Sequence, residues 1–583
     1  MLVISQNNIS ASPINTVDFV VRLTTEAAQI KLVWKEYFEE LLNEEFDWKK
    51  ENLEQVSEVS GECEEITFEE VKVAIKKAKS GKAPGPSGVV GEMLKAAGDV
   101  GIQWMTDLCN AVVSEGKIPE DWRKSWMVSV YKGKGNALEC GSYRGIKLLD
   151  QVMKVLERVI EKRVRDKVQI DSMQFGFRSG RGTTDAIFIV RQMQEKFLAK
   201  KQDVWMAFVD LEKAFDRVPR EVVWWALRKL RVDEWLVRVI QSMYEGVSTA
   251  VKLGEEESVA FPVRVGVHQG SVLSPLLFII VLEALSTEFR TGVPWELLYA
   301  DDLVLIAESE DKLIDKLRVW KKGFEEKGLK VNVGKTKVMR CSDKTGVAKE
   351  SGKFPCAICS KGVGSNSVRC VKCKMWVHKK CSGVKGRLKV DSNFQCKKCS
   401  VNGTTAVGAA SIEKNNLLLE NGESVECVEE FCYLGDMLSC GGGAGEASRV
   451  RVRCAWKKFR ELSPILTARG ASLKLKGKMY STCVRSSLIY GSETWPMKVE
   501  DKQRLERAER MMVRHMCGVT LKDRKSCEEL RQRLGIDSVS DVLRRNRLRW
   551  FGHVERKNDD DWVKACQRLE VAGGRGRGRS KKT

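Results

Sequence analysis

The sequence predicts an α+β protein with several hydrophobic cores and one small inserted metal-binding module. The chain has 583 residues, and a prior of about 100 to 200 residues per domain suggests three or four units. Short strand-like apolar runs alternate with amphipathic helical patterns between residues 100 and 306. The composition then changes abruptly to Cys, Lys and Gly in residues 351–400, which indicates a separate module.

Composition and charge limit the class of protein. Hydrophobic residues make up 43% and charged residues 31% of the chain, as in folded globular proteins rather than disordered or membrane proteins. The longest apolar stretch, residues 276–285, is shorter than the roughly 20 residues that cross a bilayer. We therefore expect a buried core helix there and no membrane partner. The net charge of +21 favours a polyanionic partner such as nucleic acid.

Two further features predict an intracellular protein. The first residues show no basic segment followed by an apolar core, so no secretory signal is visible. The cysteines outside residues 351–400 are scattered along the chain, as expected of reduced thiols.

The first expected elements lie before the apolar strands. Residues 1–60 have a helical pattern without a catalytic signature, and we interpret them as a helical connector. The next pattern predicts a helix that begins with Thr67 and Glu70 in capping-box spacing and stops at Gly81. A short strand is expected at residues 126–131, among helical patterns and Gly-rich turns.

Acidic residues follow two apolar strand-like runs. Asp210 ends the run at residues 204–210, and Asp301 with Asp302 forms the tip of a hairpin-like run at residues 297–307. Carboxylates at such positions are costly to desolvate unless a cation meets them, and paired Mg²⁺ ions are the usual counter-charge. The alternative is an ordinary solvated turn, because such dipeptides are common in turns.

A series of motifs extends from about residue 65 to the C-terminus. In order they are GKAPGPSG (81–88), YKGKG (131–135) with YRGIKLL (143–149), QFGFRSGRGTTDAI (174–187), FVDLEKAFDRV (208–218), GVHQGSVLSPLLF (266–278), YADD (299–302), GLKVNVGKTKVM (328–339) and YLG (433–435). Together they resemble the reverse transcriptase family, specifically the enzymes encoded by non-LTR (LINE-like) retrotransposons. The resemblance implies a right-hand polymerase with α-helical fingers, an antiparallel-sheet palm and a helical thumb. Fingers and palm would occupy residues 61–350.

The resemblance also implies roles for the residues that match the family's motifs. Asp210 and Asp301 would hold two Mg²⁺ ions, with Asp302 as the third catalytic carboxylate. Carboxylates from two adjacent strands suit in-line phosphoryl transfer assisted by two metals. The implied nucleotide-binding residues are Lys132, Arg144, Phe215, Gln269, Gly270 and Lys335.

Each nucleotide-binding residue has its own implied role. The ring of Phe215 would exclude a ribose 2′-OH, and residues 269–270 would lie against the incoming nucleotide, where a glycine allows close backbone approach. Lys132 and Arg144 would bind the triphosphate. Lys335 would donate a proton to pyrophosphate or contact a phosphate. The alternatives are a core aromatic at Phe215 and solvated surface charges at Lys132 and Arg144.

Two departures from the family affect these expectations. Ser87 occupies a position where the family has an aspartate, which concerns template handling more than chemistry because it lies outside the metal site. No endonuclease pattern precedes residue 60 or follows residue 550. We therefore expect the nick that primes synthesis to come from an endonuclease in trans, or from a longer version of the chain.

Seven cysteines and one histidine in residues 351–400 have metal-ligand spacing. They are Cys356, Cys359, Cys370, Cys373, His378, Cys381, Cys396 and Cys399. Eight such ligands make two tetrahedral Zn²⁺ sites, which so short a segment needs in order to fold. The order of four cysteines, one histidine and three cysteines resembles the PHD finger. That family implies interleaved sites, in which the first and third ligand pairs hold one Zn²⁺ and the second and fourth pairs the other.

The composition of this finger argues against binding of methylated histone lysine. The segment between the second and third ligands has neither an aromatic cage nor acidic groups. Residues 353–399 are rich in Lys and Arg and contain one acid, Asp391, so a basic histone tail would be repelled. We expect contact with nucleic acid or a purely structural insertion, with Trp376 as a core residue of the finger.

The remaining segments are assigned by the same resemblance. Residues 401–500 would form the primer grip, which contains YLG, and the thumb; residues 501–570 would form a basic helical C-terminal region. Trp550, Phe551 and His553 either follow a template backbone or pack as ordinary helix residues. Residues 571–583 form a Gly/Arg-rich tail that should be disordered and that binds nucleic acid nonspecifically or acts as a nuclear address.

The motifs together predict an RNA-directed DNA polymerase that acts in the nucleus and cytoplasm. Its partners would be an RNA template, a DNA primer or target, and deoxynucleotides. The rival hypothesis is a catalytically silent, retroelement-derived nucleic-acid or chromatin-binding protein that uses the finger and the basic surface. Intact carboxylates and Gln269 count against this rival, whereas the missing endonuclease pattern favours it. A truncated element copy without a cellular role is a third possibility.

Overall fold

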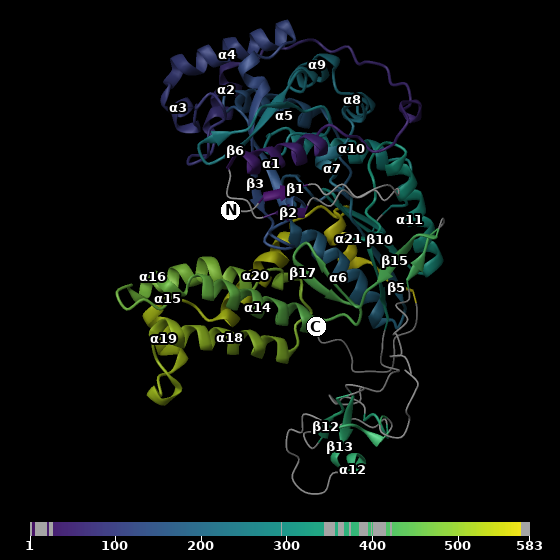
Figure 1. Cartoon of the computed structure of the whole chain (residues 1–583), viewed down its shortest axis with the longest axis vertical. Coiled ribbons are helices and arrows are strands. Elements are labelled where there is room, and N and C mark those ends of the chain that lie inside the picture. The colour runs from purple at the N-terminus through teal and green to yellow at the C-terminus, as the bar shows by residue number, and fades with distance from the viewer. Residues whose placement is uncertain are drawn as a thin grey trace.

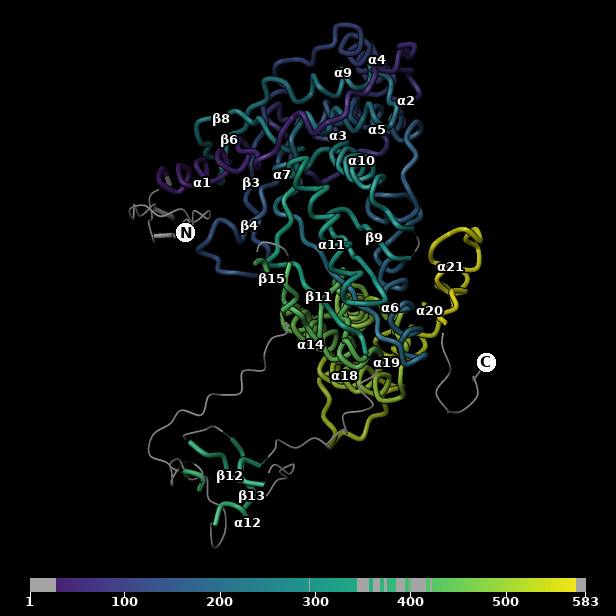
Figure 2. The backbone as a smooth tube through the Cα atoms, turned by 90° about the vertical axis from the view of Figure 1, so that its right-hand side faces the viewer, coloured from purple at the N-terminus to yellow at the C-terminus, as the bar shows by residue number. Residues whose placement is uncertain are grey.

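The structure is a computed structural model that describes residues 3–5, 20–22, 27–292, 294–342, 356–359, 367–371, 375–383, 394–397, 399, 416–419 and 422–572. A mixed sheet lies at the centre, with a group of helices and a second sheet at one end and a helical bundle at the other (Figure 1). A small module lies apart from these parts in both views (Figures 1 and 2).

The central sheet has six strands in the order β14-β15-β11-β5-β10-β9. They are β5 (Val204–Val209), β9 (Glu296–Tyr299), β10 (Asp302–Ala307), β11 (Lys337–Cys341), β14 (Leu417–Leu418) and β15 (Ser424–Cys427). Neighbours are antiparallel except β11 and β15, which are parallel. The expected antiparallel palm sheet is therefore mixed. A parallel neighbour requires a long crossover connection, and the residues between β11 and β15, which include the module, provide it.

Strand β5 is buried along its whole length, as its central place in the sheet requires. Helices α6 (Thr183–Ala199) and α11 (Glu310–Glu325) contact this sheet, and α10 (Ser274–Ser286) packs against α11 and α8 (Arg220–Lys229). Every residue of α10 from Leu276 to Ser286 is buried, which confirms the expected core helix. Its one charged residue, Glu283, accepts a hydrogen bond from Arg290 Nη1 at 2.8 Å, so the buried carboxylate has a partner.

Helices gather at one end of the central sheet (Figure 1). They are α2 (Phe68–Lys76), α3 (Gly91–Ala96), α4 (Gly98–Glu115), α5 (Met153–Lys167), α8 (Arg220–Lys229) and α9 (Glu234–Ser242). The predicted capping box is present at the start of α2. Thr67 Oγ1 accepts from the Glu70 amide at 3.3 Å, and Glu70 Oε2 accepts from the Thr67 amide at 3.0 Å. The helix ends at Lys76, four residues earlier than the sequence pattern suggests.

A second sheet and a helix from the expected N-terminal connector form another core. The sheet contains β3 (Lys124–Tyr131), β4 (Tyr143–Leu148), β6 (Ser248–Leu253), β7 (Glu256–Glu257) and β8 (Phe261–Pro262). Helix α1 (Ala27–Leu41) packs against it through Phe38, which is 1% exposed and stacks on Trp34. Residues 27–41 belong to the expected connector, but they also contribute side chains to a hydrophobic core. Two further strands, β1 (Val3–Ser5) and β2 (Val20–Arg22), pair antiparallel.

The C-terminal part consists of a β-hairpin and a helical bundle. The hairpin strands are β16 (Glu430–Tyr433) and β17 (Asp436–Ser439). The bundle contains α14 (Gly445–Glu461), α15 (Ser463–Leu466), α16 (Leu473–Met479), a π-helical turn (Tyr480–Arg485), α17 (Ser486–Leu488), α18 (Val499–Cys517), α19 (Cys527–Leu534) and α20 (Val539–Glu555). It has its own hydrophobic core. Helix α21 (Trp562–Arg568) packs on α6 of the central part.

The module is a small metal-ligand-rich unit with β12 (Ser367–Arg369), β13 (Trp376–His378) and α12 (Lys379–Ser382). The two strands are antiparallel. Among its described residues, Val368, Val377 and three cysteines are buried, and Trp376 packs against the cluster that Val377 forms with the cysteines, as the sequence predicted. None of the described helices is long and apolar enough to cross a bilayer.

Candidate active site and metal clusters

Three carboxylates meet at one end of the adjacent strands β5 and β10. Asp210 directly follows β5, Asp301 lies in the turn after β9, and Asp302 opens β10. The antiparallel register pairs Val209 with Leu303, so the next position along the strands brings Asp210 opposite Asp302. Asp301 and Asp302 are exposed, and the side chain of Asp210 is 40% exposed. The fold thus brings together residues that lie about 90 positions apart in the sequence.

Burial and like charge raise the pKa of two of the three carboxyls. Desolvation, and then the charges of Asp301 and Asp210, raise the pKa of Asp302 to about 6. Desolvation also raises the pKa of Asp301, with Asp210 adding to the effect. Asp210 Oδ2 is buried and accepts no hydrogen bond from the described residues, although Lys335 Nζ lies 3.5 Å away. Crowded carboxylate oxygens with an unsatisfied buried atom are a donor set that suits Mg²⁺.

Basic side chains face the carboxylates from the neighbouring loops and from β4. Burial and the charges of Lys335, Arg144 and Lys213 lower the pKa of Lys132, and Lys132 Nζ donates to the Gly141 carbonyl at 2.7 Å. Arg144, exposed on β4, counteracts the rise in the pKa of Asp301. Positive groups gathered in front of carboxylates form a surface suited to a metal-bound polyphosphate.

The predicted gate residue and the residues 269–270 lie near this basic group. Phe215, on the short helix α7 (Ala214–Arg217), stacks on Phe278 with ring centroids 4.3 Å apart and 28° between the planes. The carbonyl of Gln269 accepts from the Lys147 amide of β4 at 2.7 Å. Gly270 has a φ of +121°, and a Cβ there would lie 2.4 Å from the Lys147 carbonyl oxygen. Only glycine fits at this close approach of the two backbones.

Two polar residues beneath this segment were not singled out from the sequence. Gln269 Nε2 donates to Asp216 Oδ1 at 2.8 Å, and desolvation raises the pKa of Asp216 to about 6. Lys147 is 3% exposed, and burial lowers its pKa to about 7. Asp216 directly follows Phe215 inside the motif FVDLEKAFDRV, so its position in that motif could have identified it as a site residue. The burial of Lys147 on β4 was not visible from its motif.

Gln174 holds the YADD turn in place, a role that its motif did not predict. It is 1% exposed, and its Oε1 accepts from the Gly176 amide at 2.9 Å and from the Ala300 amide at 3.0 Å. Ala300 has a φ of +54°, a conformation that L residues adopt when surrounding contacts impose it. A Cβ at Gly176 would lie 2.3 Å from the Ala300 nitrogen. The QFGF segment therefore fits directly against the turn that carries Asp301.

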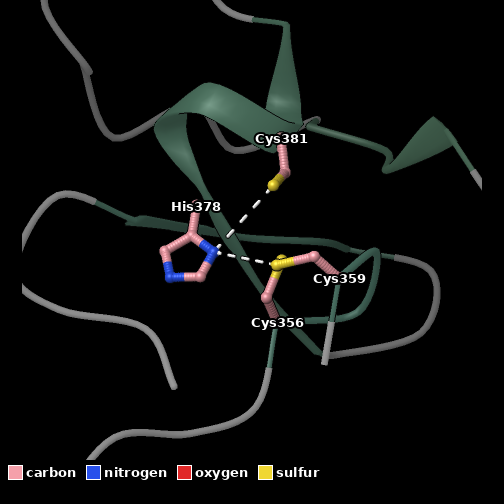
Figure 3. A group of neighbouring side chains, drawn as sticks. All are labelled: Cys356, Cys359, His378 and Cys381. Carbon is pink, nitrogen blue, oxygen red and sulfur yellow. Dashed lines mark hydrogen bonds between the residues drawn. The ribbon is translucent and has the colours of Figure 1, made fainter. Parts of the chain in front are cut away.

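The described ligand residues of the module form two clusters. Cys356, Cys359, His378 and Cys381 place one ligand atom each within 4.8 Å of one another, and His378 Nδ1 lies 3.5 Å from Cys359 Sγ and 3.9 Å from Cys381 Sγ (Figure 3). Four converging thiol and imidazole groups are a donor set that suits tetrahedral Zn²⁺.

Cys370, Cys396 and Cys399 form the second cluster within the same distance limit. Cys373, the fourth expected ligand, lies outside the described residues. The two clusters divide the described ligands in the interleaved way that the resemblance to the PHD finger implies.

The C-terminal aromatic residues have different surroundings. Trp550 packs edge-on against Phe188 of α6, with ring centroids 5.7 Å apart. His553 Nε2 lies 3.5 Å from Asp185 Oδ1, and no metal-ligand cluster among the described residues includes it. Phe551 is 55% exposed. Of the three residues, Phe551 is the one that is exposed, whereas Trp550 and His553 are partly buried. The Gly/Arg-rich tail lies outside the described residues from 573 onward.

Part of the chain is similar to known proteins. Residues 131–376, which include the carboxylates and the predicted nucleotide-binding residues, match the reverse transcriptase (RNA-dependent DNA polymerase) family. The chain is 28% identical over 295 residues to the RNA-directed DNA polymerase from mobile element jockey of Drosophila funebris, a match that covers 48% of this chain and 32% of that protein. It is 23% identical over 470 residues to a probable RNA-directed DNA polymerase from transposon BS of Drosophila melanogaster, which covers 79% and 45%.

A third relative is the putative 115 kDa protein in type-1 retrotransposable element R1DM of Drosophila melanogaster. The identity is 31% over 261 residues, and the match covers 44% of this chain and 24% of that protein. The chain therefore spans between about a quarter and a half of the length of these curated relatives.

The raised pKa of Asp302 predicts a pH-dependent gain in stability for Asp302→Asn. The folded parent binds an extra proton between pH 4 and 6, so its stability falls as pH rises through that range. The variant has no ionisable carboxyl at this position, so its stability does not fall for this reason. For a buried carboxyl a rise in pKa from 3.8 to about 6 corresponds to about 3 kcal/mol, and solvent screening of this exposed carboxyl lowers the gain at pH 7 to about 1 kcal/mol or less.

Urea unfolding at pH 4 and pH 7 without added divalent cations checks this prediction. The gain should appear at pH 7 and vanish at pH 4. Asp315→Asn, on the exposed face of α11, is the matched control and should change neither value. A similar effect of Asp302→Asn at both pH values would contradict the electrostatic explanation.

Proposed function

We propose that this chain, which carries a reverse transcriptase domain of the non-LTR retrotransposon type, is an RNA-directed DNA polymerase. The observation that carries the proposal is the meeting of Asp210, Asp301 and Asp302 at the ends of adjacent strands, opposite a group of Lys and Arg side chains. Carboxylates crowded beside a polyphosphate-binding surface suit in-line phosphoryl transfer.

The residues of the site divide the work of the reaction. Asp210 and Asp301 would hold two Mg²⁺ ions, which supply an activated primer 3′-OH and charge stabilisation for the leaving pyrophosphate. Lys132 and Arg144 would bind the triphosphate, and Lys335 would contact a phosphate or protonate pyrophosphate. Its position 3.5 Å from Asp210 supports a role near the reacting phosphates. The positive charges of Lys132, Arg144 and Lys335 would offset the negative charge that grows as the leaving group departs.

The sugar and base of the incoming nucleotide would lie between Phe215 and residues 269–270. The ring of Phe215 is held on Phe278, which restricts its movement away from a ribose 2′-OH. The hydrogen bond from Gln269 Nε2 to Asp216 fixes the orientation of the amide. The enzyme would therefore prefer deoxynucleotides because the ring excludes a ribose 2′-OH, and not because it makes an additional contact with deoxyribose.

The biological role proposed is retrotransposition primed by a nicked chromosomal 3′ end. The partners would be an RNA template, a DNA primer or target and deoxynucleotides, with an endonuclease supplied in trans or by a longer version of the chain. Similarity to polymerases of mobile elements supports this proposal. We propose that the protein acts in the nucleus and cytoplasm, in agreement with its net charge of +21 and its Gly/Arg-rich C-terminal residues.

For the module we propose a PHD-type finger with two Zn²⁺ ions. Cys356, Cys359, His378 and Cys381 would hold one ion, and Cys370, Cys373, Cys396 and Cys399 the other. The interleaved clusters support this arrangement, and so does the small size of the apolar core, which metal binding would stabilise. The basic composition of the segment supports contact with nucleic acid rather than with a histone tail.

Primer extension on an RNA template with Mg²⁺ and deoxynucleotides tests the polymerase. The parent should extend the primer, and Asp210→Asn and Asp301→Asn should each lower the rate at least about 1000-fold, because each removes a metal-binding charge at nearly constant shape. Asp315→Asn removes an exposed aspartate outside the cluster and should extend as the parent does. No extension by a folded, RNA-binding parent would refute the enzyme and favour the rival nucleic-acid-binding protein.

Substitution of the gate residue tests the sugar discrimination. Phe215→Ala should lower the preference for deoxynucleotides over ribonucleotides by about 10-fold or more, because it opens space for the 2′-OH. The ratio of kcat/KM for the two nucleotides is the measurement, since it is independent of the active fraction. Phe289→Ala removes a ring packed on Trp320 and should leave the ratio unchanged. An unchanged ratio in Phe215→Ala would show that this ring does not select the sugar.

Metal analysis tests the two zinc sites. The purified parent should contain two Zn²⁺ per chain, whereas His378→Ala and Cys399→Ser should each contain about one, because each removes a ligand from a different cluster. Cys454→Ser changes an exposed cysteine of α14 that belongs to neither described cluster and should retain both ions. Two ions bound by His378→Ala would exclude this ligand set.

A further inference from the structure

The β16–β17 hairpin borders the carboxylate cluster. Phe431 of β16 stacks on Phe208 of β5, with ring centroids 4.1 Å apart and 17° between the planes, and Phe208 precedes Asp210 by two residues. Tyr433, at the end of β16, is 3% exposed and lies 5.6 Å from Phe208 between ring centroids. A cavity of about 50 Å³ is shared by both parts and is lined by Asp210, Asp302, Lys335, Phe431 and Tyr433 among others. The turn of the hairpin therefore lies next to the proposed reaction centre.

Helix α6 of the central part holds the outgoing strand of this hairpin. Arg191 and Asp436 are 1% and 0% exposed, and Arg191 Nε and Nη2 donate to Asp436 Oδ2 at 3.0 and 2.7 Å. The remaining guanidinium contacts are to the carbonyls of Met437 and Gly443, each at 2.9 Å. A buried pair with these partners fixes geometry, because breaking either side leaves an uncompensated charge in the protein interior.

The bundle holds the turn of the same hairpin from the other side. Trp495 Nε1 donates to both carboxylate oxygens of Asp436 at 3.2 Å. The Tyr490 hydroxyl donates to the Leu434 carbonyl at 2.9 Å, and it lies 3.1 Å from the Thr183 Oγ1 at the start of α6. Tyr490 and Trp495 both belong to the segment SSLIYGSETWPM, for which the sequence had suggested only a place in the thumb.

The tip of the hairpin is a two-residue turn whose residues lie outside the strand ladder. Leu434 and Gly435 lie between the last ladder pair, Tyr433 with Asp436, and both have positive φ, +46° and +81°. The Leu434 carbonyl is thus outside the hairpin ladder, and the Tyr490 hydroxyl is its hydrogen-bond partner. Gly491, with a φ of +76°, passes close to the carboxyl of Asp436, where a Cβ would lie 3.3 Å from the carboxyl carbon. This glycine lets the bundle approach the turn.

We propose that Tyr490 and Trp495 are positioning residues that fix the turn at residues 433–436 and so hold the primer 3′ end at the carboxylates. The inference rests on the proposed polymerase function and on the likeness of YLG to a primer grip. In this arrangement one hydroxyl and one indole connect the bundle, the hairpin and the catalytic sheet. Movement of the bundle relative to the sheet would therefore displace the primer end from the reacting phosphate.

Tyr490→Phe tests this role with little effect on packing, because the ring that lies against Gly435 and Arg451 remains. Single-nucleotide incorporation on a preformed primer–template should have a maximal rate about 10-fold below the parent, since small misplacements of reacting groups lower rates steeply. The KM for the deoxynucleotide, the Kd for the primer–template and the melting temperature should stay within about twofold or a few degrees of the parent. Loss of rate without loss of binding separates positioning from a merely structural role.

Tyr480→Phe is the matched control. Its hydroxyl lies 3.3 Å from Glu509 Oε1 within the bundle core, so the same atom is removed far from the turn, and the parent rate should be retained. Equal rates for Tyr490→Phe and the parent, or equal losses in both tyrosine variants, would overturn the inference. Absence of extension by the parent itself would instead refute the proposed function, and the inference with it.

Discussion

Repulsion among the carboxylates of Asp210, Asp301 and Asp302 is the constraint around which the site is built. Desolvation, and then repulsion among the three acidic groups, raises the pKa of Asp301 and Asp302, so the folded chain carries an electrostatic cost that a divalent cation would relieve. The strand β5 behind Asp210 is wholly buried, and α10 is an almost uninterrupted apolar helix. Burial of these elements offsets the cost of the charged end of the sheet.

The loops around the carboxylates are held by polar side chains from other elements rather than by regular pairing. Gln174 fixes the turn that carries Asp301, and Asp216 fixes the amide of Gln269. These hydrogen bonds hold the site residues in position without a bound ligand. Such support is what a reaction centre requires, since chemistry that depends on in-line geometry loses rate when its groups are loosely held.

The segments that follow β11 in sequence are also connected to the central sheet. The module enters between two neighbouring strands of the sheet, and the crossover that it occupies leads to the parallel pairing of β15 with β11. The hairpin that comes next is held by α6 on one side and by the bundle on the other, through the buried Asp436. Sheet, hairpin and bundle are therefore mechanically connected at one charged residue, although each has its own packing.

Several local elements and the residue types of the candidate sites could be predicted from the sequence. The capping box at Thr67, the apolar run of α10 and the ligand spacing of the module are short-range patterns, and the structure contains each of them. The tertiary structure decided which distant residues meet. Arg191 and Asp436 are 245 positions apart, and Gln174 and Ala300 are 126 apart. Periodicity reports which face of an element is apolar and motifs report residue types, but neither encodes the partner of a buried polar group. The parallel strand, the core contributed by α1 and the supports beneath the site therefore became visible only once the chain was folded.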